Sequence, residues 1–173
     1  MFKVDDRKSD QQHEDAASVS VDESIDDSSE RRAQPVWNLI RLDGIKILLI
    51  EDTPDARVYI SRLFMRAGAH VLSASSAQEA RQILLSEEPD VIVSDIAMPD
   101  EDGLSFMRKL RLEGGEQGAK VPAMALTAFT DSQIKNQIYK AGFQAHVAKC
   151  ANFELLLKTV CELAKGENGS IVH

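Results

Sequence analysis

The sequence predicts a doubly wound α/β fold, in which helices cover both faces of a five-stranded parallel sheet. From Gly44 onward, short apolar runs alternate five times with stretches of helical periodicity, as in repeated strand-helix units. The apolar runs are nearly continuous, which is typical of strands that are buried on both faces. Five units within about 120 residues fit this fold, because an eight-fold barrel needs ~250 residues.

The first unit combines a strand over residues 45–50 (IKILLI) with a helix that starts near Thr53. Thr53 is a suitable N-cap, and Pro54 suits the first helical turn. Apolar residues then recur at i, i+3, i+4 and i+7 as far as Gly68, which is a suitable helix stop.

The second and third units follow directly. Residues 70–74 form the second predicted strand, and the helix after it runs from about Ala77 until Pro89 ends it. The third strand covers residues 90–94 (DVIVS), and after a loop the apolar spacing predicts a helix over residues 104–112.

The last two units complete the pattern. The glycine-rich residues 113–119 are predicted to form an irregular connector. A strand over residues 121–126 and a helix around residues 134–141 make the fourth unit. A short strand over residues 144–148 and a helix over residues 153–164 make the fifth.

Most of the negative charge lies near the N-terminus. Residues 1–30 hold ten acidic and three basic side chains, a net −7 of the formal −8 of the whole chain. Such a polar segment buries too little apolar surface to offset its ordering entropy, so disorder is predicted. Its charge repels nucleic acid and no clustered basic stripe follows it, so we expect no direct nucleic acid binding.

The predicted organisation has four parts: an acidic tail (1–34), a lead-in (35–43), one globular domain (44–165) and a short flexible end (166–173). The lead-in contains Trp37 and either packs on the domain or binds a partner. No apolar run approaches the ~18 residues of a membrane span, and no signal-peptide pattern opens the chain. A cytoplasmic protein is therefore expected.

Polar side chains follow the apolar runs, at the edge where a doubly wound sheet binds its ligands. They are Glu51 and Asp52, Asp95, Thr127 and Lys149. Carboxylates that share a crevice repel each other unless a cation neutralises them, and oxygen ligands suit Mg²⁺. Lys149 can pair with a carboxylate or a phosphoryl oxygen, and the Thr127 hydroxyl can donate to that oxygen. The set predicts phosphoryl chemistry on a carboxylate.

Asp95 is the predicted nucleophile. It opens a loop, DIAMPDEDG, that can hold its side chain exposed, whereas Glu51 and Asp52 adjoin as metal ligands. Phosphoryl transfer mainly needs in-line positioning and charge neutralisation, so no Ser-His-Asp set is required.

Four segments resemble the signature segments of the receiver domain of two-component response regulators: IKILLIEDTPDAR, DVIVSDIAMPDEDG, PAMALTAF and GFQAHVAKC. The resemblance covers roughly Gly44 to Ala164 and implies the flavodoxin-like (βα)5 receiver fold. It also implies a signalling switch rather than an enzyme. Such a domain assists only its own phosphorylation and dephosphorylation, and its output is a changed interaction with a partner.

The resemblance further implies the roles of the acidic residues. Asp95 would accept a phosphoryl group from a histidine kinase or a histidine phosphotransfer protein. Mg²⁺ would be held by Glu51, Asp52, Asp95 and the backbone carbonyl of Ala97.

Thr127 and Lys149 would read the phosphoryl group. In the family, the residue three positions before the lysine is aromatic and turns inward on activation. This residue is His146 here. Both a packing role and a switching role are open for His146. Ala128 after the threonine and His146 near the lysine both occur in receivers of hybrid sensor histidine kinases. The segment resembles those receivers most. Cys150 stands where the family usually has proline.

The sequence also bears on three other functions. A phosphatase that forms an aspartyl phosphate typically has a second acid two residues after the nucleophile, where this chain has Ala97. A flavin or nucleotide module is disfavoured, because no glycine-rich phosphate loop follows a strand. The main alternative is a pseudo-receiver that binds partners without phosphorylation, although the retained Asp95 and Lys149 argue against it. A phosphorylation-dependent homodimer stays open.

Overall fold

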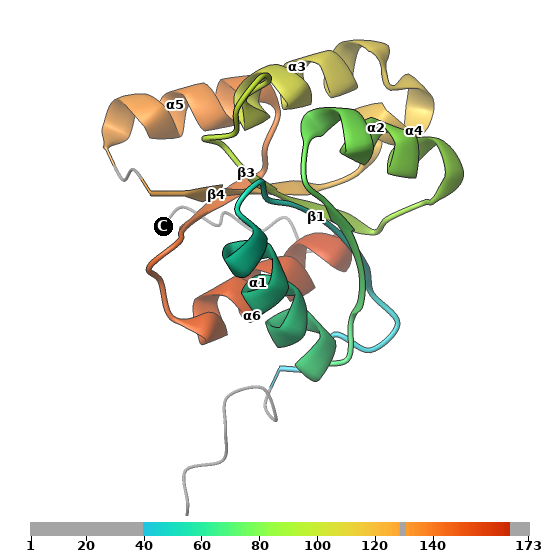
Figure 1. Ribbon diagram of the computed structural model, residues 1–173, viewed down its shortest axis with the longest axis vertical. Coiled ribbons are helices and arrows are strands. Elements are labelled where there is room, and N and C mark those ends of the chain that lie inside the picture. The colour runs from blue at the N-terminus through green and yellow to red at the C-terminus, as the bar shows by residue number, and fades with distance from the viewer. Residues whose placement is uncertain (1–39, 129–130, 167–173) are drawn as a thin grey trace, which may run out of the picture. The chain divides into compact units, whose positions relative to one another are not determined.

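The computed structural model describes residues 40–128 and 131–166 (Figure 1). The predicted acidic tail, Trp37 and the last seven residues lie outside the described residues. In chain order the elements are β1 (Lys46–Ile50), α1 (Pro54–Arg66), β2 (His70–Ala74), α2 (Ala77–Ser86), β3 (Val91–Asp95), α3 (Gly103–Glu113), α4 (Gly115–Lys120), β4 (Ala123–Thr127), α5 (Ser132–Ala141), β5 (Ala145–Ala148) and α6 (Phe153–Ala164).

The strands form one parallel sheet in the order β2-β1-β3-β4-β5. This order confirms the predicted doubly wound, flavodoxin-like fold. Helices α1 and α6 cover one face, and α2, α3 and α5 cover the other (Figure 1). Strands β3 and β4 are buried along their whole length, which explains their nearly continuous apolar sequences.

An apolar core lies on each face of the sheet. Phe106 and Ile138 are fully buried in the core under α2, α3 and α5, and Phe64 and Val160 are fully buried in the core under α1 and α6. Leu42, from the predicted lead-in, is also fully buried in the second core. No helix in the described ranges is both long and apolar enough to cross a membrane.

The structure corrects the prediction for residues 113–119, which contain most of the short helix α4 instead of an irregular connector. A Cβ added to Gly118 would lie 2.8 Å from Leu110 Cδ1, and Arg111 Nη1 donates a hydrogen bond to the Gly118 carbonyl at 2.7 Å. Glycine therefore permits close packing of α4 on α3. Composition alone does not distinguish this use from that of a loop.

The third and fourth strands end one residue later than predicted. β3 ends at Asp95 and β4 at Thr127. Asp90, predicted to start the third strand, precedes it and accepts a hydrogen bond from the Lys46 N–H through its side chain at 2.7 Å. Asp95 and Thr127 are therefore positioned by the sheet itself rather than by the loops that follow.

Candidate functional site

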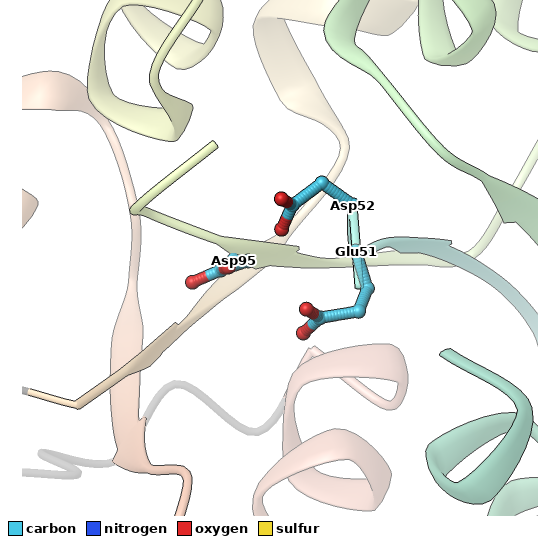
Figure 2. Close-up of side chains that lie close together, drawn as sticks. All are labelled: Glu51, Asp52 and Asp95. Atoms are coloured by element: carbon cyan, nitrogen blue, oxygen red, sulfur yellow. The ribbon is translucent and has the colours of Figure 1, made fainter. Parts of the chain in front are cut away.

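Glu51, Asp52 and Asp95 come together at the carboxyl edge of the sheet. Glu51 and Asp52 follow β1, and Asp95 ends the neighbouring strand β3 (Figure 2). Each offers a carboxylate oxygen, and these oxygens all lie within 4.8 Å of one another. The parallel pairing of β1 with β3 brings the two strand ends side by side. The grouping expected from the sequence is therefore present.

Lys149 bridges two of these carboxylates. Its Nζ lies 2.8 Å from Glu51 Oε2 and 2.8 Å from Asp95 Oδ2. Burial by itself would lower the pKa of Lys149, but the hydrogen bonds and charges of Asp95 and Glu51 outweigh it and raise the pKa above its ordinary value. The ammonium therefore stays charged and compensates two buried acids.

The donor set fits a divalent cation. Three carboxylates face one ammonium, which leaves two negative charges. The buried carboxylate of Glu51 meets only the Lys149 ammonium among the charged groups of the described residues, with Oε1 accepting its hydrogen bond at 3.1 Å and Oε2 lying 2.8 Å from Nζ. Carboxylate oxygens with places left for water are the environment that Mg²⁺ prefers.

The side chain of Asp95 is only 3% exposed, so the expectation that its loop holds it exposed is wrong. The residue belongs to the buried strand β3, and Lys149 contacts its carboxylate. The Ala97 N–H donates to Asp95 Oδ1 at 3.2 Å, and the Ser94 hydroxyl donates to the Asp95 carbonyl at 2.8 Å. The contacts with Lys149 and the Ala97 N–H orient the carboxylate, while the Ser94 hydroxyl binds only the backbone.

Gly103 was not singled out from the sequence. A Cβ at this position would collide with the backbone carbonyl of Asp95, so only glycine lets the start of α3 approach the site this closely. The available signal was a glycine directly after Asp102, whose side chain caps α3 by accepting from the Ser105 N–H at 2.8 Å.

Arg57 is a second residue that sequence reasoning missed. Its Nη1 donates to the carbonyl of Glu51 at 2.6 Å and to that of Asp52 at 3.1 Å. The guanidinium thereby ties the first turn of α1 to the backbone that carries both acids. Its presence in the segment EDTPDAR was the only signal in the sequence.

Thr127 and Lys149 lie on adjacent strand ends. Thr127 is 1% exposed, and its carbonyl accepts a hydrogen bond from the Lys149 N–H at 2.8 Å. Ala128, the next residue, is exposed.

Cys150 is exposed in a turn that is closed by the Ala151 N–H, which donates to the Ala148 carbonyl at 2.9 Å.

His146 lies in β5 and is buried. Its Nδ1 is 3.0 Å from the hydroxyl of Tyr139 on α5, and the two rings pack edge to face with centroids 5.7 Å apart. The contact joins β5 to α5 and is compatible with either packing or switching. Tyr139 was not expected to take part, because its pairing depends on how α5 is placed against the sheet.

The family model of the response regulator receiver domain matches residues 47–161. Hybrid signal transduction histidine kinase D of Dictyostelium discoideum is 32% identical over 136 residues, which cover 75% of this chain and 9% of that protein. The chain therefore corresponds to a small part of this relative.

Two solved structures are similar in both fold and sequence. Chemotaxis protein CheY4 of Vibrio cholerae is 29% identical with a TM-score of 0.64, over 69% of this chain and 98% of that one. The receiver domain of a sensor histidine kinase from Pseudomonas aeruginosa, which has a magnesium ion in its active-site cleft, is 27% identical with a TM-score of 0.65, over 70% and 98%. From its sequence, fold and acidic site, this chain belongs to the response regulator receiver domain family and is a receiver domain of two-component signalling.

Proposed function

We propose that this chain is a cytoplasmic, phosphorylation-dependent switch in which Asp95 accepts a phosphoryl group from a histidine kinase or a histidine phosphotransfer protein. The observation that carries the proposal is the position of the Asp95 carboxylate, 2.8 Å from a lysine ammonium and grouped with two further carboxylates. As a receiver domain, the chain is a signalling domain rather than a classical enzyme.

The proposed transfer needs little covalent chemistry from the protein. One carboxylate oxygen of Asp95 attacks the phosphorus of a phosphohistidine as the P–N bond breaks, and the imidazole leaves with the electron pair. Lys149 then exchanges its contact with Asp95 for one with a phosphoryl oxygen, so its charge follows the phosphoryl group. In the return step water attacks the phosphorus, which releases inorganic phosphate and restores the carboxylate. Positioning and charge neutralisation are the main requirements.

Mg²⁺ would be held by Glu51, Asp52, Asp95 and the Ala97 carbonyl, and would neutralise the charge that gathers between Asp95 and the phosphoryl oxygens. The three carboxylate oxygens that lie within 4.8 Å of one another support this assignment. The magnesium ion in the cleft of the similar Pseudomonas aeruginosa receiver supports it as well.

The proposed output surface is formed by β5 and α5. Thr127 ends β4 and Ala128 follows it, so a Thr127 hydroxyl that turns toward the phosphoryl group would move this strand end. Lys149 follows β5, which also carries His146 and its contact with Tyr139 on α5. A change at the phosphoryl group therefore has a short path to a surface where a downstream partner could bind.

Intact mass measurement after incubation with acetyl phosphate and Mg²⁺ tests the proposal. We expect one phosphoryl increment in the wild type, and none in Asp95→Asn or without metal. Asp100→Asn, in the same loop, is the matched control and should still be modified, because asparagine tolerates its positive φ of 66°. If neither acetyl phosphate nor the phosphoryl mimic beryllofluoride binds, the chain is a phosphorylation-independent interaction module.

A further inference from the structure

The three carboxylates of the site differ in how they are held. Those of Glu51 and Asp95 both contact the Lys149 ammonium at 2.8 Å. The carboxylate of Asp52 makes no hydrogen bond or ion pair with the described part of the chain. It is only partly buried, and it leaves the backbone in a different direction from that of Glu51 (Figure 2). The place of Asp52 in the site therefore depends on the backbone that carries it.

The usual contacts of a helix start do little to hold that backbone. A threonine at the N-cap ordinarily accepts a hydrogen bond from the first turn, but the Thr53 side chain makes no such bond. Pro54, the next residue, has no N–H to donate. The Thr53 N–H reaches Glu51 Oε1 only at 3.4 Å. The turn between β1 and α1 is therefore held mainly by another contact.

Arg57 supplies this contact. Its Nη1 donates to the carbonyls of Glu51 and Asp52, at 2.6 Å and 3.1 Å. These carbonyls belong to the peptide groups on both sides of the Asp52 side chain. Glu51 is fully buried, so water does not replace the donor at its carbonyl. Arg57 is itself fixed in α1, where its N–H donates to the Thr53 carbonyl at 2.9 Å. The guanidinium therefore sets the direction in which the Asp52 side chain leaves the backbone.

The charge of Arg57 has the opposite effect on a cation from its position. A guanidinium beside the acidic group repels a divalent cation, so its charge alone weakens binding. The two hydrogen bonds hold a carboxylate in place, which strengthens binding. Removal of Arg57 separates the two effects by the sign of the change in affinity.

We propose that Arg57 is a positioning residue that fixes the Asp52 carboxylate relative to Asp95, and that this placement favours Mg²⁺ over Ca²⁺. This role rests on the proposed function, in which Asp52 helps to hold Mg²⁺. Mg²⁺ demands nearly octahedral ligands at about 2.1 Å, whereas Ca²⁺ accepts irregular geometry at about 2.4 Å. A less firmly held Asp52 therefore costs more Mg²⁺ affinity than Ca²⁺ affinity.

Amide NMR titrations of the full chain with magnesium chloride, and separately with calcium chloride, test the role without any phosphorylation. The Ala97 amide is the reporter, because it donates to Asp95 Oδ1 at 3.2 Å. In Arg57→Met the dissociation constant for Mg²⁺ should rise at least about tenfold, as is typical when a residue that orients a metal ligand is removed. The dissociation constant for Ca²⁺ should rise less.

Two further variants separate position from charge. Arg57→Lys keeps the charge but replaces the planar guanidinium with a flexible point donor, so its dissociation constant for Mg²⁺ should lie between those of wild type and Arg57→Met. It tests the same point if Arg57→Met does not fold. Arg62→Met, at an exposed position on the same helix, removes an equal charge and should leave both dissociation constants unchanged.

Tighter Mg²⁺ binding in Arg57→Met, with Arg57→Lys unchanged, would show that Arg57 acts through its charge and would overturn the proposal. Equal losses of Mg²⁺ and Ca²⁺ affinity would overturn the selectivity. Wild-type Mg²⁺ affinity in both Arg57 variants would overturn the role of Arg57 and leave the proposed metal site standing. An Ala97 amide that does not respond to Mg²⁺ in the wild type would overturn both.

Discussion

Glu101 connects the loop that follows Asp95 to two helices. Both terminal nitrogens of Arg81 on α2 donate to its carboxylate at 2.7 Å, and Lys109 Nζ on α3 lies at 3.1 Å. The hydrogen bond from Arg81 is the main cause that lowers the pKa of Glu101 from 4.5 to about 2; burial opposes it, and Lys109 adds to it. We predict that Glu101→Gln destabilises the domain at neutral pH.

The size of this effect follows from the pKa. A decrease from 4.5 to about 2 corresponds to at most about 3.4 kcal/mol, at 1.36 kcal/mol per pH unit. Solvent screens the pairs, because the side chains of Arg81 and Lys109 are 38% and 56% exposed. We therefore expect a loss of about 1 to 2 kcal/mol in the free energy of unfolding.

The pH dependence gives the prediction its sign. The pKa of Glu101 is lower in the folded state, so its contribution is complete above about pH 4.5 and is lost as the pH falls toward 2. Urea unfolding of wild type and Glu101→Gln should show a difference that falls below half of its neutral value by pH 3. Glu88→Gln, at an exposed position, is the control and should change little. A difference between wild type and Glu101→Gln that stays constant from pH 7 to pH 3 would refute this reasoning.

Three further substitutions test other contacts. Lys149→Met leaves two buried carboxylates without their shared cation and should cost about 3 kcal/mol in urea unfolding; an unchanged midpoint would contradict the bridging role. Tyr139→Phe removes the hydrogen bond to His146 Nδ1 and should cost about 1 kcal/mol, with a shift of the His146 side-chain nitrogen resonances; unshifted resonances would count against the contact. Gly103→Ala forces a Cβ against the Asp95 carbonyl and should cost about 1 to 3 kcal/mol, so a variant as stable as wild type would rule out the close approach.

Much of the fold could be predicted because each strand meets helices on both faces. The resulting apolar runs, such as residues 47–50, differ sharply from the amphipathic helices between them. Parallel strands all end at one edge, so the meeting of Glu51, Asp52 and Asp95 followed once the strands were assigned.

The rest depends on contacts that have no local pattern. The bridge from Lys149 to two acids requires the exact placement of the β5 end, and the contact between Tyr139 and His146 depends on how α5 packs against the sheet. Residues 115–120 form α4 because glycine can pack closely on α3, which glycine content alone does not reveal. The burial of Asp95 was missed because its strand extends one residue further than predicted.

The most direct test of the central claim is to locate the phosphoryl group chemically. After phosphorylation with acetyl phosphate and Mg²⁺, borohydride reduces an acyl phosphate on aspartate to homoserine, and peptide mass spectrometry identifies the position. The account predicts homoserine at position 95, with Asp52, Asp100 and every other aspartate unchanged. Homoserine at another aspartate, or none in a chain that carries the phosphoryl mass, would contradict it.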